Sequence, residues 1–325
     1  MRDHQRIVGG GAAMNRKSRT VVAAISLMGL FAAMLFAQAT PKLTGPYLGQ
    51  KPPGKTPVPF AIGHLGADLH GGPVFSQDGK EVFWSLMGGK QHILTSRLTE
   101  DGWSSPQAIK FPTGSAGTGE SAYHQREYVK PSGEPCLSYD GTRLFFMAQE
   151  TAATDYRESI WVSERTKDGW GTPKQVSPLV NEMSTHWQMS VAKSGNLYFQ
   201  GRSAMVGDIY VSTFADGEYQ KPVALGSAIN TRHDEGCPFV APDESYLVFY
   251  RINRGSSQKA DLFISFKTPD GTWAKAKSMD KLNRGGVNEV CPSVSRDGKY
   301  FFFLRSTRDG LSSYWVSARV LDDYR

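Results

Sequence analysis

The sequence contains very few cysteines and none of the short motifs that mark common enzymes. It has 3 cysteines in 325 residues, with no Cys-x-x-Cys pair or His-rich stretch of the kind that indicates a metal site. It also lacks the Gly-x-Ser-x-Gly elbow of serine hydrolases. The sequence therefore predicts no metal site and no nucleophilic triad.

A long apolar run occurs only near the N-terminus. Residues 14–19 are basic, residues 20–37 are uncharged and mostly apolar, and "AQA" at Ala37–Ala39 fits the small-x-small rule of signal peptidase. We therefore expect a signal peptide over residues 1–39, cleaved after Ala39, with residues 1–13 an over-extended start. An uncleaved anchor is the alternative, because the run approaches the roughly 18 residues that a membrane span needs. Cleavage predicts a periplasmic or secreted protein without a membrane span.

A large excess of one charge is absent once the N-terminal segment is set aside. The whole chain has 37 Lys and Arg against 31 Asp and Glu, a net charge of +6. Residues 1–39 hold five of the basic residues and one acidic residue, which leaves 32 against 30, a net of +2. The basic pI therefore belongs largely to the export signal, and we expect no nucleic-acid partner.

The sequence does contain an internal repeat. The phrase "GPVFSQDGKEVFWS" and its four later copies are centred on the turn residues Asp78, Asp140, Ser194, Asp243 and Asp297. Proline lies five residues before the turn in every copy except the third, which has Met189 there. Self-similarity at intervals of 62, 54, 49 and 54 residues indicates a repeat architecture.

Each copy continues in the same way. A short alternating segment such as "DIYVSTF" (208–214) follows, and four of the five copies then have an Asp-Gly turn, as in "EDGWSSPQAI" (100–109). Asp-Gly between strands is a strong hairpin signal, because Gly accepts the positive φ of tight turns. With no helical periodicity, each copy is interpreted as four short antiparallel strands, the unit of a β-propeller blade.

The last copy is incomplete, and the N-terminal region supplies a candidate for its missing strand. The chain ends at Arg325 before a fourth strand, whereas "TPVPFAIG" (56–63) resembles one. Pairing this segment into the last blade would remove an open sheet edge. We predict a linker over residues 40–55 and one all-β domain over 56–325, a propeller of five blades. Six blades is the alternative, since residues 112–133 could contain a further strand.

The repeat resembles a known family. The "S-x-D-G-K-x-hydrophobic-F" turn followed by "D-I-Y-V-S" is similar to the TolB-like propeller repeat, a relative of WD repeats found in exported bacterial proteins, over roughly residues 56–320. The resemblance implies a propeller fold. It implies no single activity, because the family includes translocation-machinery subunits, enzyme accessory domains and proteins of unknown role, and its motif marks turns and packing rather than catalytic residues.

Equivalent blades place residues of one repeat offset in a ring around the channel. Eight positions before the turn lie His70, Ser132, His186, Glu235 and Glu289, and eight positions after it lie Leu86, Ala148, Arg202, Arg251 and Arg305. Both rings should lie at the same mouth of the channel. One interpretation is a ligand-binding site built from His70, His186, Glu235, Glu289, Arg202, Arg251 and Arg305, in which the arginines bind an anionic group. In the other, Glu and Arg pair with each other and tie neighbouring blades together.

Two functions are compatible with this ring. The sequence favours binding of a protein, peptide or cell-wall glycan at the channel mouth without catalysis, by a monomer. The alternative is a glycan-active hydrolase or lyase, which needs two carboxyls roughly 5–10 Å apart; Glu235 and Glu289, with Asp68 or Asp234, are the candidates. No cofactor is predicted, although an axial Ca²⁺ held by Asp or Glu would be compatible with the ring.

Two of the cysteines share one repeat position. Cys237 and Cys291 both lie six residues before the turn, in adjacent blades. An exported protein permits a disulfide between them, but innermost strands of neighbouring blades diverge, and bridging needs Cα atoms within about 7 Å. A disulfide and a pair of buried thiols both stay open, and Cys136 is expected in the core.

Overall fold

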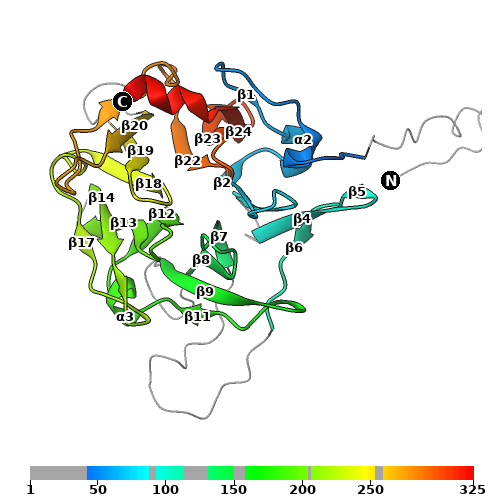
Figure 1. Ribbon diagram of the computed structural model, residues 1–325, viewed down its shortest axis with the longest axis horizontal. Coiled ribbons are helices and arrows are strands. Elements are labelled where there is room, and N and C mark those ends of the chain that lie inside the picture. Colours follow the sequence, from blue (N-terminus) through cyan, green and yellow to red (C-terminus); the bar gives the residue numbers. More distant parts are fainter. Residues whose placement is uncertain (1–41, 88–92, 113–130, 150–157, 204–205, 253–258) are drawn as a thin grey trace, which may run out of the picture. The chain divides into compact units, whose positions relative to one another are not determined.

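The computed structural model describes residues 42–87, 93–112, 131–149, 158–203, 206–252 and 259–325. Residues Leu43–Arg325 form one compact unit. It is a ring of five small antiparallel sheets (Figure 1). The chain is therefore a five-bladed β-propeller, as predicted, and not a six-bladed one.

Each blade is built from three longer strands and a short outer strand. The first strands, which line the channel, are β2 (Leu69–Phe75), β7 (Pro131–Leu137), β12 (Thr185–Val191), β18 (Asp234–Val240) and β22 (Glu289–Val294). The second strands are β3 (Glu81–Leu86), β8 (Arg143–Gln149), β13 (Leu197–Ser203), β19 (Tyr246–Ile252) and β23 (Tyr300–Thr307). The third strands are β4 (Ile93–Thr99), β9 (Glu158–Thr166), β14 (Val206–Ser212), β20 (Ala260–Phe266) and β24 (Gly310–Ser317). The outer strands are β6 (Gln107–Ala108), β11 (Lys174–Gln175), β17 (Val223–Ala224), β21 (Lys277–Ser278) and, in blade 5, β1 (Val58–Pro59).

The Asp-Gly turns lie where the third strand of a blade leads to its outer strand. The hairpin partners there are β5 (Gly102–Trp103), β10 (Gly169–Trp170), β15 (Phe214–Ala215) and β16 (Glu218–Tyr219). Gly102, Gly169 and Gly217 all have positive φ, which confirms the predicted hairpins. Short helices occupy connections: η1 (Tyr47–Gly49), α2 (Ile62–Leu65), α3 (Pro178–Asn181) and η2 (Ala318–Tyr324). Within the described residues, no helix is long and apolar enough to cross a membrane.

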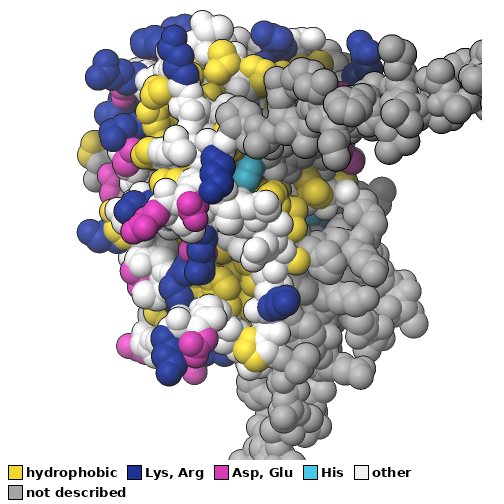
Figure 2. Space-filling view, turned by 90° about the vertical axis from the view of Figure 1, so that its right-hand side faces the viewer, with side chains coloured by type: hydrophobic (Ala, Val, Ile, Leu, Met, Phe, Trp, Pro, Cys, Tyr) yellow, Lys and Arg dark blue, Asp and Glu magenta, His cyan; other side chains and the backbone are white. Residues whose placement is uncertain are grey.

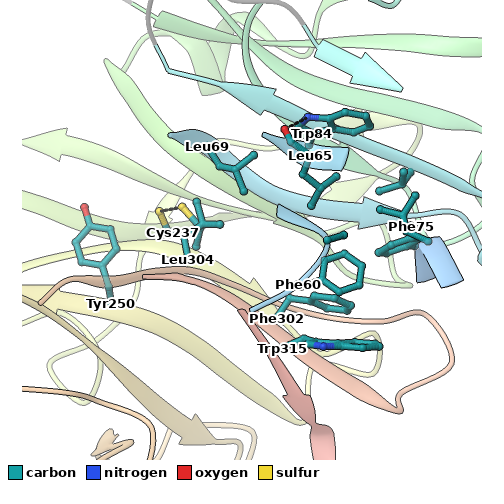
Figure 3. Packing of buried hydrophobic residues seen from close by; sticks show 14 of the residues in the cluster. Phe60, Leu65, Leu69, Phe75, Trp84, Cys237, Tyr250, Phe302, Leu304 and Trp315 are labelled. Atoms are coloured by element: carbon teal, nitrogen blue, oxygen red, sulfur yellow. Dashed lines mark hydrogen bonds between the residues drawn. The ribbon is translucent and has the colours of Figure 1, made fainter. Parts of the chain in front are cut away.

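The N-terminal strand closes the ring. β1 pairs antiparallel with β24, with Val58 opposite Trp315, so the predicted closing strand is confirmed. The next residue after β1, Phe60, is fully buried. Its ring centroid lies 4.8 Å from that of Trp315 and 5.0 Å from that of Phe302 (Figure 3). Aromatic packing therefore supports the two backbone pairs of this short strand.

Much of the predicted linker is packed against the propeller. Leu48 is fully buried, and the Tyr47 ring lies 4.9 Å from the rings of both Phe75 and Tyr300, in blades 1 and 5. The Trp103 backbone N–H donates to the Leu43 carbonyl at 2.8 Å. The packed body therefore begins near Leu43 and not at residue 56.

The repeated turn has a hydrogen-bond basis. In blade 1 the Ser76 hydroxyl donates to Asp78 Oδ1 at 2.6 Å, and Asp78 Oδ1 accepts from the Lys80 backbone N–H at 3.1 Å. Gly79 has a φ of +66°, which glycine adopts without steric cost. Blades 2 and 5 repeat these contacts around Asp140 and Asp297. The motif therefore marks a turn, as expected.

The third copy departs from the motif and uses its neighbour instead. Ser194 stands where the other copies have Asp, and its hydroxyl donates to Glu244 Oε1 at 2.6 Å. Glu244, from the turn of blade 4, also accepts from the side chains of Asn196 and Tyr198. Ser194 Oγ itself accepts from the Asn196 backbone N–H at 3.2 Å, as Asp78 does from Lys80, so Glu244 adds a link between blades to this turn.

The core consists of apolar layers between neighbouring sheets. Phe301 and Phe303 of blade 5 pack with Val248 and Ile264 of blade 4. Phe249 of blade 4 packs against blade 3 in the same way. These aromatics therefore lie between neighbouring blades.

Candidate functional site

The channel has two ends, which we name by strand direction. The upper mouth is where the first strand of each blade begins, and the lower mouth is where the turns join first to second strands. All five first strands have a register irregularity midway along their length. Such bulges re-aim side chains.

The bulges direct side chains toward the channel axis. Glu134, Trp187, Cys237 and Cys291, from blades 2 to 5, have φ between +48° and +62°. Blade 1 has glycines instead, and a Cβ on Gly72 would lie 3.3 Å from the Cys291 carbonyl oxygen. The bulges therefore bring side chains together at the channel axis. We call this group the axial cluster; it consists of His70, Glu134, Trp187, Cys237 and Cys291.

His70, a predicted site residue, lies in this axial cluster. His70 is 6% exposed. His70 Nε2 lies 3.8 Å from Glu134 Oε1, and its ring centroid lies 5.5 Å from that of Trp187. His70 therefore spans from blade 1 toward blades 2 and 3.

Glu134 is a buried carboxyl that the predicted ring did not include. It is 1% exposed, and neither of its carboxyl oxygens has a hydrogen-bond partner among the described residues. Burial raises its pKa well above the ordinary value, and the neighbouring Cys237 and Glu158 raise it further. Burial therefore favours the protonated, uncharged form of the Glu134 carboxyl.

Cys237 and Cys291 meet at the axis. Both are fully buried thiols, and their sulfur atoms lie 3.3 Å apart (Figure 3). The expectation that diverging strands keep them apart did not allow for the bulges, which turn both side chains toward each other. Cys136 lies instead in the core between blades 2 and 3, as expected.

The predicted glutamates and two of the predicted arginines form buried ion pairs. Arg251 Nε lies 2.6 Å from Glu235 Oε1, and in blade 5 Arg305 Nε lies 2.8 Å from Glu289 Oε1. Both glutamate side chains are fully buried. Burial raises the pKa of each glutamate, while its arginine opposes that shift.

These ion pairs hold the segments that connect blades. Arg251 Nη2 donates to the Ile229 carbonyl at 2.9 Å, and Arg305 Nη2 donates to the Leu282 carbonyl at 2.8 Å. Ile229 and Leu282 precede the first strands of blades 4 and 5. The guanidinium groups of Arg251 and Arg305 are therefore already bound within the protein. These contacts favour the interpretation that the four residues tie neighbouring blades together.

Among the described residues of blade 3, no equivalent ion pair is found. Its bulge is longer, so Arg202 lies opposite Ser184, whose carbonyl accepts from the Arg202 N–H at 3.1 Å. The Arg202 side chain is exposed. The side chains of His186 and Ser132 lie outside the described part of the structure, although the His186 backbone pairs with Gln200.

Half-exposed carboxylates lie at the upper mouth. Asp208 and Asp261 occupy the same repeat position near the start of β14 and β20, and Asp234 begins β18. Burial raises the pKa of Asp208, and the neighbouring Asp234 raises it further; burial also raises the pKa of Asp261. In the sequence, Asp208 and Asp261 are the first residues of the repeated segments "DIYVS" and "DLFIS". This shared position is the feature from which they could have been predicted.

Two long side chains cross the lower part of the channel. Gln188 Nε2 of blade 3 donates to the Pro292 carbonyl of blade 5 at 2.7 Å. Arg296 of blade 5 donates through Nη2 to the Leu137 carbonyl of blade 2 at 2.6 Å. A cavity of about 140 Å³ remains beside them. These hydrogen bonds link blades 2, 3 and 5 across the lower part of the channel.

No metal site is apparent in the part of the chain that the structure describes. Among these residues, no group of three or more His, Cys, Asp or Glu side chains is arranged to hold a metal ion.

Comparisons with known proteins support the fold but do not identify a family. Neither a family model nor a curated protein matches this sequence. An α-L-arabinofuranosidase from Lactobacillus brevis is similar in structure, with a TM-score of 0.50 and 13% identity over 76% of this chain and 90% of that one. At this identity the similarity shows the β-propeller fold alone.

Other similar structures are more distant. Hydrazine synthase of Kuenenia stuttgartiensis matches with a TM-score of 0.41 and 17% identity over 74% of this chain, which spans 57% of that protein's chain. The arabinofuranosidase PaAbf62A of Podospora anserina matches with a TM-score of 0.47 and 12% identity over 82% of this chain and 94% of that one. The class that the fold defines is a five-bladed β-propeller.

Proposed function

We propose that this chain is an exported, monomeric propeller that binds a protein, peptide or glycan ligand at its upper mouth without transforming it. The observation that carries the proposal is the burial and ion pairing of the two predicted glutamates. Glu235 and Glu289 are fully buried and each is held by an arginine. A catalytic acid or base must reach the reacting atoms of a substrate, and these two carboxylates have no such access. The N-terminal sequence supports a periplasmic or secreted location.

The upper mouth offers polar groups that suit a binding role. Asp208, Asp234 and Asp261 are half-buried and Arg202 is exposed. Carboxylates accept and guanidinium groups donate hydrogen bonds, which suits sugar hydroxyls, peptide amides and cationic side chains. On the face in Figure 2, basic and acidic side chains are interspersed. This pattern differs from the continuous basic stripe typical of nucleic-acid binding.

A thermal-shift screen tests the proposal. Residues 40–325 would be heated with neutral and acidic oligosaccharides, peptidoglycan fragments and Lys-rich peptides. We expect a saturable rise in Tm with one probe class, because a ligand that binds only the folded state stabilises it. The rise should be lost in Asp261→Asn and kept in Asp168→Asn, a matched change at an exposed hairpin turn. A rise that survives Asp208→Asn, Asp234→Asn and Asp261→Asn alike would place the ligand elsewhere.

A second candidate function rests on the Asp208 and Asp234 pair. The pKa of Asp208 is raised by burial and by Asp234, and glycosidases use a carboxyl of raised pKa as a general acid beside a second carboxylate. A glycan-active enzyme would therefore use these two residues rather than Glu235 and Glu289. Release of reducing ends from an oligosaccharide, lost in Asp208→Asn at unchanged Tm, would favour hydrolysis over binding.

A further inference from the structure

The two axial cysteines are positioned by the same device in adjacent blades. Cys237 and Cys291 have φ of +48° and +51° at the bulges of β18 and β22. Their sulfur atoms lie 3.3 Å apart, and both residues are fully buried. Each thiol is therefore held facing the other with little room for a different partner.

We propose that Cys237 and Cys291 form a disulfide that cross-links blades 4 and 5 when the chain folds under oxidising conditions. A disulfide needs an S–S distance of about 2.05 Å, so the sulfur atoms must approach by about 1.2 Å from their present 3.3 Å. The third cysteine, Cys136, lies in the core between blades 2 and 3, where its thiol donates to the Leu137 carbonyl at 3.7 Å. The fold therefore specifies which two cysteines pair.

The bond forms by thiol–disulfide exchange with an oxidised dithiol oxidoreductase or a small-molecule disulfide. The thiolate of one cysteine attacks a sulfur of the oxidant's disulfide and expels one thiolate, which gives a mixed disulfide. The second cysteine, as thiolate, then attacks the protein sulfur and expels the other thiolate of the oxidant. The two cysteine protons pass to the two leaving thiolates, and the oxidant is reduced by two electrons.

Burial determines when this exchange takes place. The hydrogen bond with Cys237 and burial raise the pKa of Cys291 well above its ordinary value. Exchange requires that the oxidant reach a cysteine sulfur, and in the folded protein both cysteines are fully buried. The bond therefore forms before blades 4 and 5 close, and once formed it resists external reductants.

The cross-link would stabilise the ring. The two cysteines are 54 positions apart in sequence, and a bond that closes a loop of this length restricts the unfolded chain. It joins the first strands of the last two blades at the axis, whereas β1 and β24 close the ring at the outer part of blade 5. We expect the oxidised protein to melt roughly 5–10 °C above the reduced protein.

Thiol counting after refolding tests the proposal. The protein is refolded from urea either with oxidised glutathione or with excess reductant, and then denatured and alkylated. Oxidative refolding should leave one alkylated cysteine, Cys136, and peptide mapping should find the Cys237 and Cys291 peptides joined. Reductive refolding should leave three. Three alkylated cysteines after oxidative refolding, or a bond that involves Cys136, would overturn the proposal.

Variants separate the cross-link from other effects of oxidation. Cys136→Ala should keep both the joined peptides and the Tm difference between oxidised and reduced protein, whereas Cys237→Ala should lose both. If Cys237→Ala does not fold, the thiol count of the unmodified protein still decides. Rapid formation of the bond when oxidised glutathione is added to the folded, reduced protein would contradict the burial argument.

Discussion

At the scale of single residues, the most informative group is the Glu134 carboxyl at the channel axis. It is fully enclosed, contacts His70 only at 3.8 Å, and has a raised pKa because water is excluded. A polar group buried without hydrogen bonds lowers stability. The buried Glu134 carboxyl should therefore lower the stability of the folded protein, and a substitution at this position can measure the loss.

Replacing Glu134 with Gln should change how stability depends on pH. The folded state keeps the Glu134 proton to a higher pH than the unfolded chain, so the free energy of unfolding falls as the pH rises above the ordinary glutamate pKa. The fall is at most about 1.4 kcal/mol per pH unit. Glu134→Gln removes this slope, so urea denaturation should find the variant more stable than the original protein at pH 8 and most similar to it near pH 4.

The matched control is Glu218→Gln, an exposed glutamate. It should leave the pH profile unchanged. A Glu134→Gln profile parallel to that of the original protein from pH 4 to pH 8 would mean that the Glu134 pKa is not raised.

The buried ion pair of blade 5 makes a second prediction at this scale. Glu289→Gln leaves the Arg305 charge buried without its carboxylate, which costs about 3–5 kcal/mol. We expect a matching loss in the free energy of unfolding, measured in urea. Glu164→Gln, which breaks the exposed pair between Glu164 and Lys174 at 3.2 Å, should cost less than about 1 kcal/mol. Equal effects of the two substitutions would remove the structural role assigned to Glu289.

At the scale of elements, the bulge in each first strand explains why the predicted ring and the observed axis differ. The strands and turns could be predicted because the repeat shows them five times. The predicted site used the residues eight positions before the turn, such as Glu235 and Glu289, which face the connections between blades. The residues six positions before the turn, such as Glu134 and Cys237, reach the axis. A shift of one residue moves a side chain to the other face of a strand, and nothing in one sequence marks where the bulge occurs.

The closing strand gives a prediction for this scale. β1 has only two residues, so its contribution depends on Phe60, which is fully buried against Trp315 and Phe302. Phe60→Ala should reduce the free energy of unfolding by about 3–5 kcal/mol, as other buried aromatic truncations do. Val58→Ala, at a position 39% exposed, should cost much less in the same denaturant titration. A small effect of Phe60→Ala would mean that the ring closes without the N-terminal segment.

At the scale of the whole molecule, five blades form a ring whose lower channel is crossed by side chains and whose upper mouth carries half-exposed carboxylates. The ties from Gln188 and Arg296 link blades across the channel. The fold could be predicted from the repeat, but the function could not, because propellers serve many roles and the functional residues depend on local strand geometry.

The most direct test of the central claim is recovery of the ligand after binding. The probe that raises the Tm most is incubated with the protein, and mass spectrometry then measures the probe and any products. The account predicts saturable binding, weakened at least tenfold in Asp261→Asn, with the probe recovered unchanged. Cleavage of the probe by the original protein, abolished in Asp208→Asn while its Tm is unchanged, would contradict the account and identify an enzyme.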